Sequence, residues 1–159
     1  MAIQIVVCSV RNFFDDRDNP KKDIKSFCKD INKKFNITLD AKENKEVYFE
    51  SIPDAWDVHE LLLKYNYNEI SDILASEPIL PYNIEGIHEM HMPTVVREGE
   101  RHIVISTATF KSAIEKADAV IKQHTDEESY KRLKTGVLDI YMEAAEFSLR
   151  ETLPIFWIY

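Results

Sequence analysis

Glycine is scarce in this chain, with 3 glycines among 159 residues. Glycines let the backbone approach phosphate groups closely, and both the dinucleotide-binding motif and the P-loop need several of them at fixed spacings. Gly86, Gly99 and Gly136 are too far apart for either motif. The sequence therefore excludes the common glycine-rich nucleotide loops, although it does not exclude every kind of nucleotide site.

Cysteine and long apolar runs are also rare. Cys8 and Cys28 are too few for a disulfide framework, and both lie at apolar positions, where thiols are usually buried and inert. No run approaches 18 consecutive apolar residues, so we expect no membrane span. The N-terminus lacks the basic start and the cleavage site of a secretory signal. These absences predict a cytoplasmic protein with reduced thiols and one globular domain over residues 1–159.

Basic residues are outnumbered, because 28 Asp and Glu stand against 20 Lys and Arg, for a net charge of −8. A surface that holds nucleic acid must be basic, so we expect no direct nucleic-acid binding. Residues 20–35 contain six lysines and two aspartates, whereas residues 40–77 contain ten acidic residues and three lysines. The molecule should therefore have an acidic region and a smaller basic one.

The apolar periodicity predicts an α+β fold, with a small mixed sheet of about four or five strands and about five helices packed on it. Strands are expected at 2–10, 36–40 and 46–50, and in a hairpin over 84–107 that turns at Gly99-Glu100 and pairs Val96 with Ile103. Helices are expected at about 20–35, as a pair within 53–77, at 109–124, and from about 125 to Pro154. Capping boxes are expected at Ser51/Asp54, Asn66/Glu69 and Thr125/Glu128.

The segment RNFFDDRDNP follows the first expected strand and is predicted to be a loop. Asp15, Asp16 and Asp18 lie at the carboxyl end of that strand, where α/β sheets place their sites, and three carboxylates can hold Mg²⁺. Arg17 would neutralise part of such a cation site. The other two interpretations are a solvated turn and a contact for a partner protein made by Phe13, Asp15 and Asp16.

The histidines do not form an expected metal site. His88 and His91 would point to opposite faces of a strand. In the predicted hairpin, His91 and His102 lie about 20 Å apart at ~3.3 Å per residue. An acid–base role for one histidine stays open, but no nucleophile motif accompanies it. We therefore assign no catalytic residue, no metal and no cofactor.

The acidic segment 40–77 carries aromatic residues among its carboxylates, which is the composition of protein–protein hot spots. Trp56 in particular lies off the apolar stripe of the expected helix. The segment is either a solvated helix face with half-buried aromatics or a surface for a basic partner. The residues assigned to a partner surface are Glu43, Glu46, Glu50, Asp54, Trp56, Asp57 and Glu60, together with Phe13, Asp15 and Asp16.

Residues 154–159 end the chain without a charged side chain, which would be an aggregation hazard if they were exposed. We expect them to dock as a strand, with burial in a homo-oligomer as the alternative.

The predicted function is the binding of another protein, because the usual motifs of catalysis are missing. The specific hypothesis is inhibition of a basic enzyme, in the manner of an immunity protein, an antitoxin or a phage-encoded inhibitor of a nuclease. The alternative is a small metal-dependent hydrolase or nuclease that uses Asp15, Asp16 and Asp18.

Overall fold

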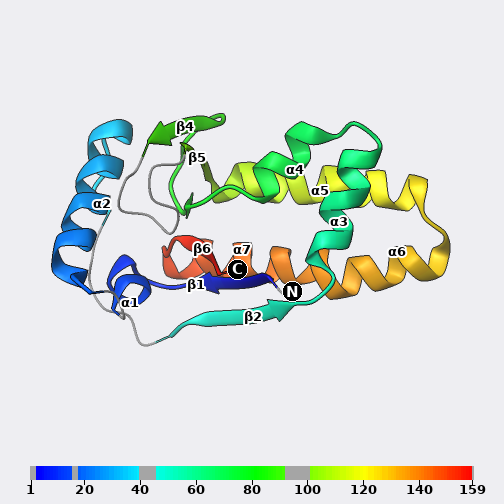
Figure 1. Cartoon of the computed structure of the whole chain (residues 1–159), viewed down its shortest axis with the longest axis horizontal. Helices are drawn as coiled ribbons and strands as arrows, with labels where there is room; N and C mark the ends of the chain where they lie inside the picture. Colours follow the sequence, from blue (N-terminus) through cyan, green and yellow to red (C-terminus); the bar gives the residue numbers. More distant parts are fainter. Residues whose placement is uncertain (1–2, 16–17, 40–45, 92–100, 159) are drawn as a thin grey trace.

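The sheet organises the whole chain. A computed structural model of the protein describes residues 3–15, 18–39, 46–91 and 101–158. Within these residues, six strands form one mixed sheet in the order β2-β1-β6-β3-β5-β4, and helices pack on it (Figure 1). The α+β prediction is confirmed, and the expected four or five strands are slightly too few.

The first and last strands of the described chain lie side by side. β1 (Ile3–Val7) pairs antiparallel with both β2 (Tyr48–Ile52) and β6 (Ile155–Ile158). β1 has buried side chains on both faces, as its uninterrupted apolar run predicts. β6 in turn contacts β3 (Ile79–Leu80), so the apolar C-terminal segment is docked within its own chain.

The hairpin exists, but its predicted register is wrong. β4 (His88–His91) pairs antiparallel with β5 (Arg101–Ser106), and Glu89, rather than Val96, lies opposite Ile103. This register places His88 opposite Val104. Val104 is fully buried, and it lies on the face of the sheet that the smaller core covers. Burial of that face favours the observed register. The expected turn lies outside the described residues.

The larger core lies on one face of the sheet. It is closed by α3 (Ala55–Lys64), α4 (Asn68–Leu74), α5 (Thr107–His124), α6 (Glu127–Leu133), the π-helical turn η1 (Lys134–Leu138) and α7 (Asp139–Glu151). The predicted inward positions of the last two expected helices are all buried, which confirms their helical period. Those positions are Ala113, Ile114, Ala117, Val120, Ile121, Leu133, Val137, Tyr141, Ala144 and Ala145. None of the helices in the described part of the chain is both long enough and apolar enough to cross a bilayer.

The smaller core lies on the other face, under α1 (Val10–Phe14) and α2 (Pro20–Phe35). The segment after β1 was expected to be a loop, and its first part is instead α1. The helix forms because the Ser9 hydroxyl accepts a hydrogen bond from the Asn12 N–H at 3.1 Å and because Phe14 is fully buried. The expected strand at 36–40 is wrong for its described residues, because α2 ends in a left-handed Asn36 and residues 37–39 have no strand pairing.

The expected capping boxes are wrong as well. Ser51 lies inside β2, and the residues before α3 and α4 make no side-chain cap. At α6 the cap is Asp126, one residue after Thr125, and its carboxylate accepts the Ser129 N–H at 2.7 Å. Thr125 instead donates its hydroxyl to the Ile121 carbonyl at 2.6 Å, at the end of α5. The carboxylate of Asp126 therefore caps α6, while the hydroxyl of Thr125 is already hydrogen-bonded to α5.

Candidate partner-binding site

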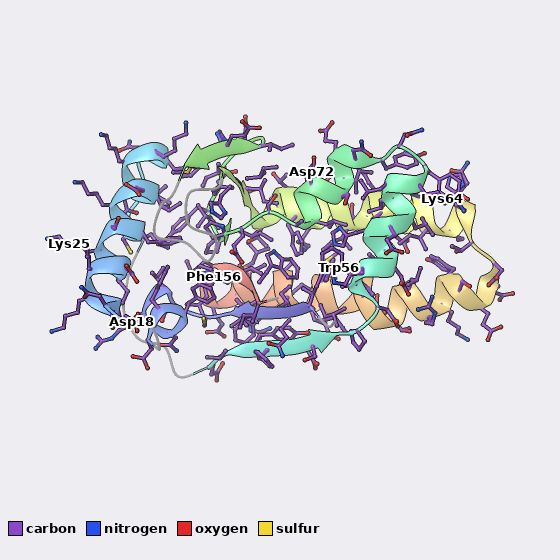
Figure 2. All side chains as sticks on the ribbon, in the orientation of Figure 1. Asp18, Lys25, Trp56, Lys64, Asp72 and Phe156 are labelled. Carbon is purple, nitrogen blue, oxygen red and sulfur yellow. The ribbon has the colours of Figure 1, made fainter. Side chains whose placement is uncertain are left out.

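A small cavity opens where α3 and α4 meet above the larger core. Its volume is about 140 Å³, and its inner wall includes Tyr141 and Trp157. Two large apolar side chains on α3 flank it and remain exposed, with Trp56 at 43% and Leu63 at 49% of their surface. Asp72 on α4 also lines it and is exposed (Figure 2). We call Trp56, Leu63 and Asp72, with the cavity between them, the α3–α4 surface.

A buried polar chain lies beneath this cavity. His59 is only 7% exposed, and its Nδ1 lies 3.0 Å from Ser71 Oγ while its Nε2 lies 3.4 Å from Tyr141 Oη. Burial lowers the pKa of His59, so the ring is neutral near pH 7. A neutral imidazole has one donor and one acceptor, and the two hydroxyls can satisfy both in either tautomer. The three side chains thereby connect α3, α4 and α7.

The Ser71–His59 pair resembles half of a nucleophilic site, but its surroundings favour a structural role. Acyl transfer needs N–H groups aimed at the developing oxyanion. Ser71 lies within α4, where its own N–H already donates to the Tyr67 carbonyl at 3.2 Å. Ser71 is also buried, and its hydroxyl is held by the ring of His59. We therefore interpret the chain as a polar network that fixes the floor of the cavity.

Two acidic residues at the start of α3 are partly neutralised by a distant arginine. Arg132 on α6 lies 3.1 Å from Asp54 Oδ1 and 3.1 Å from Asp57 Oδ2. The hydrogen bond to Asp57, followed by the charge of Asp54, raises the pKa of Arg132. Because all three side chains are well exposed, these pairs contribute little to stability. Their main effect is on the surface charge, because they neutralise part of the charge of Asp54 and Asp57. Asp72 is the carboxylate that lines the cavity itself.

The other predicted partner residues do not all gather here. Glu46 and Glu50 are exposed at and before β2. Phe13 is half-buried on α1, on the opposite face of the sheet from α3, and its ring stacks on Phe156 with centroids 4.0 Å apart. Asp15 is exposed at the end of α1. Glu43 and Asp16 lie outside the described residues.

The metal-dependent alternative stays a prediction. Within the described residues, no three His, Cys, Asp or Glu side chains are grouped as metal ligands would be. Asp15 and Asp18 are both exposed, and Asp16 is not described. The expected wide separation of His91 and His102 is wrong, because His91 pairs with Arg101 and His102 with Met90 at neighbouring positions of the hairpin.

The two cysteines have no site of their own. Cys8 is buried in the smaller core, and burial raises its pKa to about 12, so its thiol stays protonated. Cys28 is half-buried on α2 against the same cluster. A reactive thiol needs an electropositive, accessible setting, which the buried Cys8 does not have.

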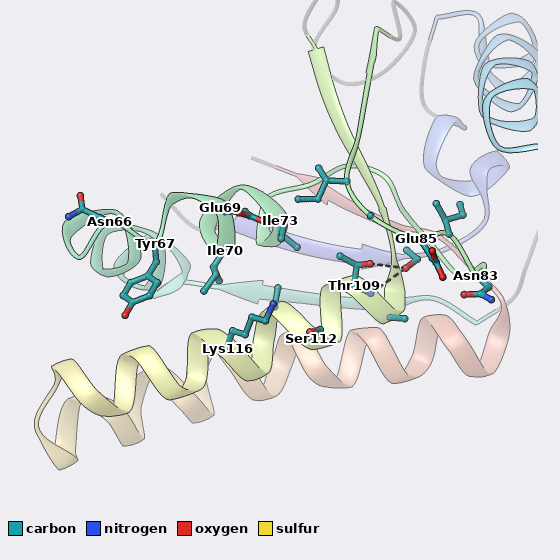
Figure 3. A pocket seen from close by; sticks show the side chains of 16 residues that line it. Asn66, Tyr67, Glu69, Ile70, Ile73, Asn83, Glu85, Thr109, Ser112 and Lys116 are labelled. Atoms are coloured by element: carbon teal, nitrogen blue, oxygen red, sulfur yellow. Dashed lines mark hydrogen bonds between the residues drawn. The ribbon is translucent and has the colours of Figure 1, made fainter.

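A second, larger cleft of about 840 Å³ runs along α5, between α4 and the segment 83–87 (Figure 3). Its polar side chains are spread along it: Lys116 lies toward the Tyr67 end, and Thr109 lies beside Glu85 at the other end. Sites for small molecules bring a few polar groups together around one ligand. The cleft therefore does not define a substrate class.

Comparison of the chain with protein-family models, curated proteins and solved structures finds no match. The geometry of the site is therefore what indicates its function. Sequence reasoning identified Trp56 and the α3 carboxylates but missed Ser71, Asp72 and Arg132, which lie on other elements. The burial of His59 could have been predicted from the sequence, because His59 follows Ala55 by one helical turn and so lies on the apolar side of α3.

Proposed function

We propose that the chain binds a basic partner protein through the α3–α4 surface. The observation that carries the proposal is the pair of exposed apolar side chains beside an apolar cavity. Trp56 and Leu63 are seven residues apart, which places them on one face of α3, with Glu60 between them. Hot spots of protein interfaces combine a large aromatic side chain with a pocket and a polar rim.

The chemistry of the cavity supports a lysine or arginine as the anchor of the partner. Besides the polar network at its floor, the cavity is lined by the apolar side chains of Ile3, Leu74 and Ala75, which would cover the methylene stem of such a side chain. Asp72 would receive the charged head, and the exposed ring of Trp56 offers a cation–π contact. The net charge of −8 would steer a basic partner toward the molecule.

The kind of partner proposed is a basic enzyme, of which a nuclease-type toxin is the leading example. An enzyme that cleaves nucleic acid must be basic to hold phosphates, so an acidic protein can block it without any chemistry of its own. Under this proposal the chain acts as an inhibitor or immunity protein.

The proposal is tested by comparing the wild-type chain with Trp56→Ala. The partner is captured from the native host at low salt, purified, and titrated against both forms by calorimetry. We expect Trp56→Ala to weaken binding by about tenfold or more, and higher salt to weaken wild-type binding. If the partner is a nuclease, adding the wild-type chain should stop its cleavage of RNA or DNA.

The matched control is Ile87→Ala, which removes another exposed apolar side chain outside the α3–α4 surface. It should leave the affinity unchanged. Equal affinity for the wild type and Trp56→Ala would contradict the proposal, as would a partner whose activity the chain does not inhibit and whose binding is equal at all salt concentrations.

A further inference from the structure

β2 leaves one edge of the sheet open. In the strand order it is the first strand, and among the described residues it pairs only with β1 (Figure 1). An edge strand offers backbone N–H and C=O groups to a further strand, and proteins that do not use such an edge usually cover it or blunt it with charge. The edge of β2 is therefore a place where an extended chain can add to the sheet.

One face of this edge presents an exposed aromatic side chain, Phe49. Phe49 lies opposite Val6, and Ser51 lies opposite Gln4, which in turn lies opposite Ile158 of β6. Residues opposite one another share a face. Phe49 is 51% exposed and Ile158 is 39% exposed, so α1 and α2 do not cover this part of the sheet.

The other face of the edge is acidic. Tyr48 and Glu50 point to the side that α7 covers, and Tyr48 Oη donates to Glu143 Oε2 at 3.2 Å. Burial raises the pKa of Tyr48, and the charges of Glu143 and Glu50 raise it further. Glu50 and Glu143 are both exposed, so two carboxylates face solvent on this side of β2.

We propose that the open edge of β2 binds an extended segment of a partner protein in which basic and apolar residues alternate. Side chains of a strand alternate between faces, so such a segment places its basic residues against Glu50 and Glu143 and its apolar residues against Phe49. A second copy of this chain is a poorer match, because β2 itself has no lysine or arginine to oppose Glu50. This surface is separate from the α3–α4 surface and goes beyond the function proposed above.

The test uses the whole chain and two synthetic peptides of eight residues. The first alternates lysine and valine, and the second has four lysines followed by four valines. Only the first can place all its lysines on one face of a strand. We expect the alternating peptide to shift the amide resonances of β2 and slow their hydrogen exchange, and to bind about tenfold more tightly than the block peptide.

Two variants locate the contact. Glu50→Lys and Phe49→Ser should each weaken the binding of the alternating peptide by about tenfold. Their matched controls are Glu115→Lys, an exposed acid on α5, and Ile87→Ser, and both should bind like the wild type. Circular dichroism checks the folding of each variant, and the comparison of the two peptides needs no variant at all.

Three outcomes would overturn the inference. They are equal binding of both peptides, unchanged β2 amides on saturation, and a wild-type dimer that Phe49→Ser dissociates, because a dimer would make a second copy the occupant of the edge. Trp56→Ala should bind the alternating peptide normally, so failure at this edge and failure at the α3–α4 surface can be told apart.

Discussion

At the scale of single residues, His59 is neutral because it is buried, and this makes stability depend on pH. Its pKa is lowered in the folded state, so below the unfolded value of about 6.5 the unfolded chain binds more protons. The free energy of unfolding should therefore fall as the pH falls from about 6.5 through the folded pKa. Urea unfolding at a series of pH values measures this loss.

The matched variant is His59→Gln, which removes the titration but keeps a polar side chain beside Ser71 and Tyr141. At pH 7 it should lower the free energy of unfolding by about 1–3 kcal/mol, because it disturbs buried hydrogen bonds. It should also reduce the loss of stability toward pH 5. His124→Gln, on a ring that stacks on Tyr65, serves as the control. An unchanged pH slope in His59→Gln would refute this account of His59.

Residue-scale features of the site were predictable only where they depend on one helix. The exposure of Trp56 follows from its place off the apolar stripe of α3, and the structure agrees. The contacts of Arg132 with Asp54 and Asp57 join positions 75 or more residues apart. Asp72 reaches the cavity only because α4 folds back beside α3. A periodic pattern contains no information about such distant neighbours.

At the scale of elements, replacement by alanine should have opposite effects on stability at Gly86 and Gly136, the two glycines whose surroundings the structure describes. Gly136 lies in the helical turn η1, and an added Cβ would meet only Asp54 Oδ2, at 3.6 Å, an ordinary contact. Gly136→Ala should raise the free energy of unfolding by about 0.5–1 kcal/mol, because alanine favours the helix. Gly86 has φ of +81° and open space around it, so Gly86→Ala should cost roughly 1–2 kcal/mol in backbone strain.

Thermal and urea unfolding of the two variants, side by side, measure this contrast. A stabilised Gly86→Ala would be incompatible with the left-handed turn, and a destabilised Gly136→Ala would show that η1 does not tolerate a side chain there.

Elements were predictable where one chain segment determines them. α5 and α7 keep a helical apolar period over many residues, and their inward positions were identified correctly. The hairpin register was not, because it depends on which face of β4 and β5 meets the smaller core, and that face is defined by α1 and α2. Likewise, the expected strand at 36–40 had suitable β-branched residues but no neighbouring strand to pair with.

At the scale of the whole molecule, β6 connects two parts of the sheet that are distant in sequence. It pairs with β1 on one side and with β3 on the other, so the last strand holds the first strand against the β3–β5–β4 group. Its Phe156 side chain packs in the smaller core, and Trp157 packs in the larger one. The indole N–H of Trp157 also donates to the Ser76 carbonyl at 2.8 Å.

Trp157→Ala should therefore weaken the whole fold rather than fray its end. We expect a loss of about 3–5 kcal/mol in the free energy of unfolding, because a large cavity and an unpaired carbonyl remain in the larger core. Ile158→Ala, at the exposed end of the same strand, should cost well under half as much. If β6 instead served mainly as a dimer contact, Ile158→Ala would change the molar mass measured by light scattering. In that case Trp157→Ala would change the unfolding midpoint only at low protein concentration. A large, concentration-independent loss in Trp157→Ala alone is the result that assigns β6 to the core of its own chain.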